Sequence, residues 1–135
     1  MMPLLVDSGY WIALESLDDQ NHLAALNYWQ RLKADMPMLL STTYIFDEVV
    51  TFFNSRQNHA KAVEIGNILL SSSFVEMIEV DSQLFEEGWR YFERHKDKHY
   101  SFTDCVSFGV MNDRMLETAL SFDRHFKQAG FKTLP

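Results

Sequence analysis

The sequence predicts a single α/β domain in which a parallel sheet carries helices on both faces. The main observation is an alternation along the chain: short apolar runs, too short to be helices, are separated by longer segments with helical periodicity. A second observation is that residues 1–135 contain no repeat, no low-complexity tract and no linker rich in Pro, Gly or Ser. We therefore treat residues 1–135 as one domain with a layered architecture.

Five short runs are the predicted strands. The first, MPLLV, is nearly continuous in apolar residues and suits a buried strand, whereas VEMIEV alternates apolar and polar residues. The last run is expected at an edge of the sheet. The predicted strands are Met2–Val6, Met38–Ser41, Val75–Val80, Ala119–Phe122 and Phe131–Leu134.

The segments between these runs are the predicted helices. Asp18 and Asp19 break one helix and cap the next, Asp81 caps another, and Gly130 closes the last. The helix that contains CVSFGVM is apolar almost all round, so we expect it to be central and buried. The predicted ranges are 8–17, 21–34, 43–56, 59–72, 82–96, 103–115 and 123–129.

Composition excludes several classes of protein. The net charge of −7 argues against binding nucleic acid through a broad basic surface, although it permits a nuclease whose local charge is reversed by metal. The lone Cys105 excludes an internal disulfide and a cysteine-based zinc site. No apolar run reaches the roughly 18 residues of a membrane span, and the start does not resemble a secretory signal. We expect a cytoplasmic protein without a membrane partner.

Two strands end in the same way, at an Asp. LLVD ends at Asp7 and LSFD at Asp123, so both side chains should stand at the carboxyl edge of the sheet, where sheets of this type place their sites. The simpler interpretation is that each Asp only caps the helix that follows. Taken singly, neither residue decides between these two roles.

Two further acids lie on helices. Asp104 opens the apolar helix in an S-x-x-D capping box, yet it shares a helical side with Phe108 and Met111 and has no Lys or Arg three or four residues on. A buried carboxylate costs several kcal/mol unless it is paired or bound to metal. In the helix over 43–56, Glu48 lies at the edge of the apolar stripe and can point inward, whereas Asp47 falls on the polar face.

Together these four acids would converge on one pocket. Unneutralised carboxylates repel one another, and hard oxygen ligands of this kind suit Mg²⁺ or Mn²⁺, which retain waters and accept phosphate oxygens. Such a centre can activate a water molecule for phosphoryl displacement. The pattern therefore favours a metal centre for phosphoryl displacement, with Asp7, Glu48, Asp104 and Asp123 as its candidate catalytic residues and metal ligands.

The chain resembles PIN domains, and in particular the VapC-like toxins of bacterial toxin–antitoxin pairs. The resemblance covers nearly the whole chain and rests on the order and spacing of several motifs, since no single motif is specific. One departure is Asp7-Ser8-Gly9, where the family often has Asp-Thr-Ser or Asp-Ser-Ser. The motifs are LLVDSGYWIAL (4–14), STTYIFDE (41–48), SFTDCVSF (101–108) and ALSFDRHFKQAGF (119–131).

The resemblance implies a PIN-like three-layer α/β/α sandwich with a mostly parallel central sheet and metal-dependent endoribonuclease activity on RNA. It implies an acid at each of the four positions named above, an antitoxin partner that inserts a segment near the site, and a homodimer. Within this interpretation, Ser8, Thr103 and Ser121 are candidates to hydrogen-bond the carboxylates that hold the metal. The RNA target and the preferred metal stay open.

Alternatives remain at this stage. His95 and His99 are spaced like two ligands on one helix face, but their charged setting favours a solvated face over a role in holding RNA phosphates. A non-catalytic, receiver-like module that binds Mg²⁺ and a protein is the main competitor. It would require paired acids after the first strand and a late Lys, and ALSF has none. An inactive PIN domain and a nuclease for structured DNA are also consistent with the acids.

Overall fold

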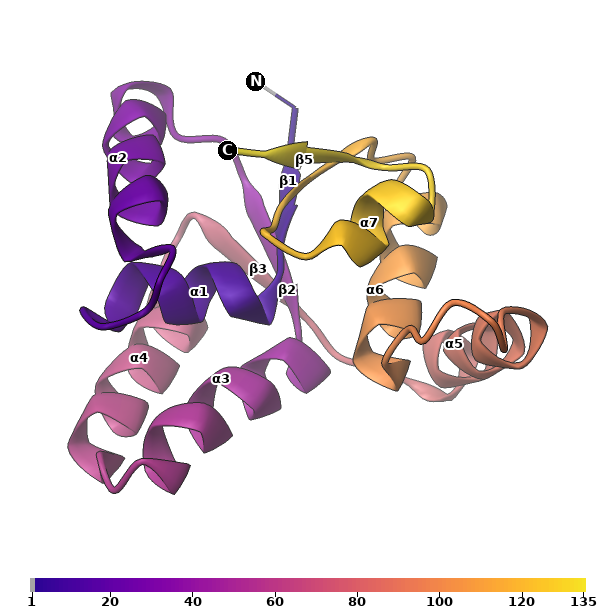
Figure 1. Cartoon of the computed structure of the whole chain (residues 1–135), viewed down its shortest axis with the longest axis horizontal. Helices are drawn as coiled ribbons and strands as arrows, with labels where there is room; N and C mark the ends of the chain where they lie inside the picture. The colour runs from indigo at the N-terminus through magenta and orange to yellow at the C-terminus, as the bar shows by residue number, and fades with distance from the viewer. Residues whose placement is uncertain (1) are drawn as a thin grey trace.

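The fold was analysed in a computed structural model that describes residues 2–135. Its centre is a sheet of five strands in the order β3-β2-β1-β4-β5, and every neighbouring pair is parallel. Within the described residues, six helices of eight or more residues and two shorter helical segments connect and cover it (Figure 1). The strands are β1 Leu4–Val6, β2 Leu39–Thr42, β3 Val75–Ile78, β4 Thr118–Leu120 and β5 Lys132–Leu134.

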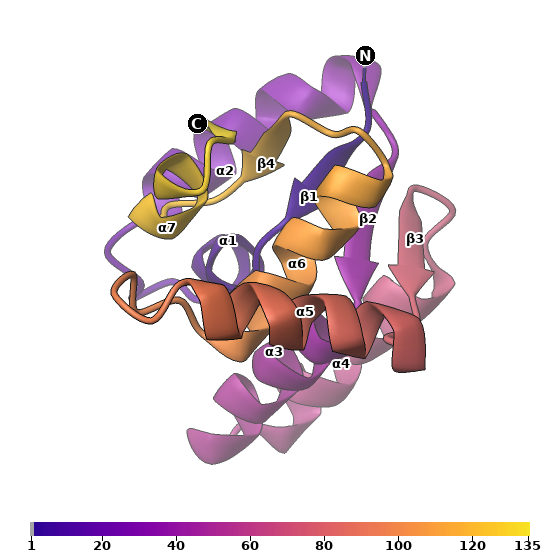
Figure 2. The same ribbon diagram turned by 90° about the vertical axis from the view of Figure 1, so that its right-hand side faces the viewer.

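Helices cover both faces of this sheet. In Figure 1, α1 and α2 lie on one side of the strands, with α3 and α4 below them, while α6 and α7 lie on the other side. Helix α5 packs against α6 and crosses it on the outside of the molecule (Figure 2). The helices are α1 Ser8–Glu15, α2 His22–Leu32, α3 Thr43–Ser55, α4 His59–Ser71, α5 Ser82–Arg94, α6 Phe102–Asp113 and α7 Arg124–Gln128. The predicted α/β fold, with helices on both faces of a parallel sheet, is confirmed.

The strand order fixes where a site can form. The chain runs from β1 outward to β2 and β3, then returns to the other side of β1 as β4 and continues to β5. The order therefore reverses between β1 and β4, and a crevice opens at the carboxyl ends of strands at such a switch point. Asp7 follows β1 and Asp123 follows the β4 region, so the two acids flank this crevice.

The buried strands explain why this arrangement is stable. All three residues of β1 are buried, as are all four of β2, because both faces of the central strands are covered by helices. Strand β3 is only half-buried throughout, which agrees with the alternation of VEMIEV and with its place at an edge. Helix α6 is buried along most of its length, including Cys105, as its apolar composition predicts.

Most element boundaries differ from the predicted ones by one or two residues. The helix over 21–34 ends at Leu32 and tightens into a 3-10 turn, Lys33–Asp35, before Pro37. Such tightening satisfies carbonyl groups that the end of an α-helix leaves unpaired. The fifth strand, predicted at the edge from Phe131, is confirmed over Lys132–Leu134 beside β4.

The end of α6 is a correction with a specific cause, because the predicted helix runs to Met115 and the observed one ends at Asp113. Met115 has φ 53° and is exposed. Its N–H donates to the Asn112 carbonyl, and the N–H of Leu116 donates to that of Met111. These two bonds form a Schellman motif, which usually has Gly at the left-handed position. Because Met115 rather than Gly occupies this position, the sequence contains no signal that would predict the end of the helix.

Candidate metal centre

Asp7 combines the two roles that the sequence left open. It is the N-cap of α1, where its Oδ1 accepts the N–H of Ser8 at 2.9 Å. Its Oδ2 accepts the hydroxyl of Ser121 at 3.0 Å, which links β1 to the end of β4. Asp7 can therefore cap a helix and also belong to the acidic site, because its carboxylate has one oxygen for each role. The side chain is buried at the centre of the crevice.

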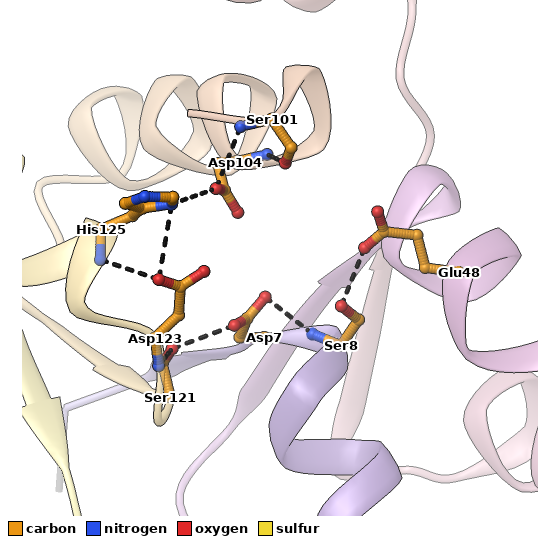
Figure 3. Close-up of polar contacts among 8 residues, drawn as sticks. All are labelled: Asp7, Ser8, Glu48, Ser101, Asp104, Ser121, Asp123 and His125. Carbon is orange, nitrogen blue, oxygen red and sulfur yellow. Dashed lines mark hydrogen bonds and ion pairs between the residues drawn. The ribbon is translucent and has the colours of Figure 1, made fainter. Parts of the chain in front are cut away.

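The other two aspartates also cap helices. Asp123 is the N-cap of α7 and accepts the N–H of His125 at 2.9 Å. Asp104 forms the expected capping box with Ser101 at the start of α6 and is buried, with 7% of its surface exposed. In Figure 3 the second oxygens of Asp104 and Asp123 point into the space between the two side chains. Both aspartates therefore present an oxygen to the crevice beyond their capping bonds.

His125 joins these acids and was missed by the sequence analysis. Its Nδ1 lies 3.2 Å from Asp104 Oδ2 and 3.4 Å from Asp123 Oδ1. The ring packs edge-on against Tyr100, with centroids 5.3 Å apart. The only hint in the sequence is its place two residues after Asp123, on the first turn of a helix that the acid caps. Its closeness to Asp104, 21 residues earlier, is a tertiary feature.

Glu48 enters the site from α3 on the opposite side. The hydroxyl of Ser8 donates to Glu48 Oε1 at 2.8 Å, so the turn after β1 connects Asp7 to Glu48. A contact with Thr103 lowers the pKa of the Glu48 carboxyl against the effect of burial. Asp47 is exposed and accepts the Thr51 hydroxyl within its own helix. The predicted difference between the inward Glu48 and the outward Asp47 is confirmed.

One cleft of about 450 Å³ contains all four predicted acids. The carboxyl groups come from four different parts of the chain, and Figure 3 shows them around a common space. Three ligand atoms, one each from Asp104, Asp123 and His125, lie within 4.8 Å of one another; this tighter group does not include Asp7 or Glu48. His99, which was expected on a solvated face, also lines the cleft, whereas His95 contacts the Tyr91 carbonyl.

Crowding of carboxylates changes their acidity. Burial raises the pKa of Asp7 to about 7, and the neighbouring charge of Asp104 adds to the effect, while the hydrogen bond from Ser121 opposes it. Burial is also the largest cause that raises the pKa of Glu48 and of Asp104. In Asp104 the neighbouring Asp123 raises the pKa further, and the hydrogen bond from His125 lowers it. The site therefore holds more negative charge than its protein surroundings balance.

This donor set fits a divalent cation. Carboxylate oxygens are the ligands that hard divalent ions prefer, and a bound ion would offset the repulsion that raises these pKa values. Ser8 and Ser121 each donate a hydrogen bond to one of the acids, and Thr103 lies near Glu48. Such contacts orient ligands before an ion binds.

Within residues 2–135, none of the helices is long and apolar enough to cross a membrane.

Comparison with known proteins defines the class. The PIN domain model matches residues 4–132, almost the whole chain, and the protein belongs to the PIN domain family. Two curated relatives, from two strains of Mycobacterium tuberculosis, are named 23S rRNA-specific endonuclease VapC20. Each is 33% identical over 128 residues, which cover 95% of this chain and 95% of the relative.

Solved structures agree with this assignment. The crystal structure of M. tuberculosis VapC20, described as a sarcin-ricin loop cleaving toxin, superposes with a TM-score of 0.86 at 30% identity over 95% of both chains. A toxin–antitoxin complex from Klebsiella pneumoniae (TM-score 0.62, 16% identity, 90% of this chain and 87% of the other) shares the fold. So does FitAcB from Neisseria gonorrhoeae (TM-score 0.66, 15% identity, 100% and 97%).

Proposed function

We propose that this protein is a divalent-metal-dependent endoribonuclease and the toxin of a toxin–antitoxin pair. The observation that carries the proposal is the meeting of Asp7, Glu48, Asp104 and Asp123 in one cleft at the switch point of a PIN sheet. No element of the chain supplies more than one of these four acids. A fold that needed only helix caps would not require Glu48 to face the same cleft.

The four acids are the proposed metal ligands, and Mg²⁺ or Mn²⁺ is the proposed ion. When bound, such an ion favours ionisation of a water molecule and stabilises the negative charge that develops as the phosphodiester bond breaks. Ser121 and Ser8 hold the carboxylates of Asp7 and Glu48 by hydrogen bonds. Asp104 and Asp123 are fixed by the capping geometry of α6 and α7. The chain thus supplies pre-oriented ligands on rigid elements.

The proposed substrate follows the relatives. VapC20 is named for its action on 23S rRNA and is described as cleaving the sarcin-ricin loop. Since the similarity extends over 95% of both chains, the same ribosomal RNA is the first substrate to test. An antitoxin is the proposed protein partner, in line with the description of the VapC20 structure as that of a toxin.

The decisive experiment is cleavage of 23S rRNA in isolated ribosomes and of a pool of unstructured and structured RNA. Reactions contain Mg²⁺, Mn²⁺ or EDTA, and the cut sites are mapped by primer extension. We expect discrete cuts that require metal and disappear in Asp7→Asn. Equal cutting by wild type and by this variant would reveal a contaminating nuclease and refute the proposal. Cutting of structured DNA in preference to RNA would reassign the substrate.

Three further expectations belong to the same proposal. Residues 1–135 form one nuclease domain, the protein forms a homodimer, and it works in the cytoplasm. Limited proteolysis, light scattering after gel filtration and fractionation of expressing cells test them in turn. A monomer at micromolar concentration would refute the dimer without affecting the nuclease.

A further inference from the structure

Among the residues that the structure describes, His125 is the only one whose side-chain nitrogen contacts the carboxylates of the cleft. We propose that His125 Nδ1 is itself a metal ligand, together with Asp104 and Asp123, and that the centre consequently prefers Mn²⁺ to Mg²⁺. This inference rests on the proposed metal-dependent function and adds a ligand and an ion preference to it.

The distances between the donor atoms support direct ligation. Two ligands at right angles, each about 2.1 Å from an octahedral ion, are roughly 3 Å apart. His125 Nδ1 lies 3.2 Å from Asp104 Oδ2 and 3.4 Å from Asp123 Oδ1, close to that spacing. One ligand atom from each of the three residues lies within 4.8 Å of the others. An ion can therefore replace the hydrogen bonds with only small movements of the side chains.

The ring is held in place by its surroundings. His125 sits in the first turn of α7, where its own N–H is bonded to the cap Asp123. Tyr100, itself buried, packs edge-on against the imidazole, and 18% of the His125 side chain is exposed. A ring fixed at the wall of a charged cleft needs little further ordering when it binds an ion.

The chemistry of the donor decides the ion preference. Mg²⁺ is a hard ion that binds carboxylates and water and loses its water reluctantly, whereas imidazole favours first-row transition metals. A centre that adds an imidazole to its carboxylate ligands therefore gains more with Mn²⁺ than with Mg²⁺. A different role for His125 is that of a protonated counter-ion, displaced when the metal enters. These two roles predict different surroundings for the bound ion.

Electron spin echo envelope modulation on the Mn²⁺-loaded full chain separates the two roles. A nitrogen bound to Mn²⁺ produces modulation from ¹⁴N, and a displaced imidazole does not. We expect the modulation in wild type, its loss in His125→Gln, and its retention in His99→Ala, which removes the other imidazole that lines the cleft. Wild type grown with ¹⁵N-labelled histidine should exchange the ¹⁴N pattern for that of ¹⁵N, which gives a test that needs no substitution.

Calorimetric titration measures the preference itself. The ratio of Mn²⁺ affinity to Mg²⁺ affinity should exceed one in wild type and fall roughly tenfold or more in His125→Gln. Bound Mn²⁺ without nitrogen modulation in wild type, or modulation lost only in His99→Ala, would overturn the proposal. RNA cleavage by the same wild-type sample distinguishes a failure of this inference from a failure of the proposed nuclease function. Cleavage without nitrogen ligation refutes this inference alone, and nitrogen ligation without cleavage refutes the nuclease alone.

Discussion

The two halves of the cleft deal with negative charge in different ways. On the side of α6 and α7, Asp104 and Asp123 share the imidazole of His125. On the side of α1 and α3, Asp7 and Glu48 receive hydrogen bonds from serine hydroxyl groups. We call the first group the imidazole half and the second the hydroxyl half. Only the imidazole half contains a group that can itself carry a positive charge.

This difference shows where an ion is needed most. A hydroxyl group orients a carboxylate but leaves its charge unbalanced, and Asp7 is the acid whose pKa rises to about 7. Asp104 is also buried, yet its contact with His125 lowers its pKa against the effect of burial. The hydroxyl half should therefore respond more strongly to metal, to pH and to removal of a carboxylate. Substitutions in each half, together with changes of pH and metal, test that asymmetry.

Replacement of an acid in the hydroxyl half should have the largest effect on catalysis. Glu48→Gln keeps the shape of the side chain but removes the charge offered to the metal. The rate of RNA cleavage under single-turnover conditions should fall on the order of 100- to 1000-fold. Asp47→Asn, at the adjacent and exposed position, is the matched control and should cleave like wild type. Equal losses in both variants would show that the helix, rather than the carboxylate, matters.

The metal-free protein should become less stable as the pH rises. The pKa of Asp7 is raised in the folded state, so its contribution to stability is complete below pH about 4 and is lost as the pH rises through about 7. The rise in the pKa of Asp7 from 3.8 to about 7 corresponds to a contribution of ~4 kcal/mol at most to the free energy of unfolding. In EDTA at pH 8, Asp7→Asn should raise the melting temperature by roughly 5 °C.

Bound metal should cancel the advantage in melting temperature that Asp7→Asn has over wild type in EDTA. Addition of Mn²⁺ at pH 8 should raise the melting temperature of wild type and leave Asp7→Asn nearly unchanged, since ligands must be deprotonated to bind an ion. Thermal scans in EDTA at pH 5.5 and pH 8 provide the comparison. A metal-free wild type that is more stable at pH 8 than at pH 5.5 would contradict the assigned role of Asp7.

The sequence predicts those parts of the site whose positions depend on neighbouring residues in the chain, and it misses those that depend on tertiary packing. LLVD and LSFD place Asp7 and Asp123 at strand ends because an apolar run and the residue that ends it are neighbours in the chain. The periodicity of one helix separates Glu48 from Asp47 in the same way. His125 was missed because its approach to Asp104 depends on how α6 and α7 pack, which no local pattern encodes. The strand order that brings the halves together is likewise a tertiary property.

The two serines should differ in their effect on metal affinity. Ser121 is buried and bridges the halves, donating to Asp7 and accepting the N–H of Asp123. Its hydroxyl lowers the pKa of Asp7, so Ser121→Ala should weaken Mn²⁺ binding at pH 7 about tenfold. Ser8→Ala, which removes a donor from the less buried Glu48, should weaken binding less. Calorimetry on both variants measures the difference. A greater loss of Mn²⁺ affinity in Ser8→Ala than in Ser121→Ala would contradict the prediction.

A change at the far end of α6 should leave both halves intact. Met115 is exposed and has φ 53°, a conformation that costs a side chain about 1 kcal/mol relative to Gly. Met115→Gly should raise the free energy of unfolding by about that amount, measured with urea, without changing cleavage. Gly130→Ala, at φ 98°, is the opposite control and should destabilise. A stabilised variant with impaired cleavage would show that the site depends on the end of this helix.

We expect the four acids to hold one metal ion between them. The most direct measurement is an anomalous difference map from crystals of the wild-type protein grown with Mn²⁺. We predict a peak in the cleft, within bonding distance of carboxylates from both halves, with Asp7 and Asp104 among them. A map in which Mn²⁺ binds elsewhere, or in which the cleft stays empty while the ion saturates the protein in solution, would contradict metal binding by the four acids.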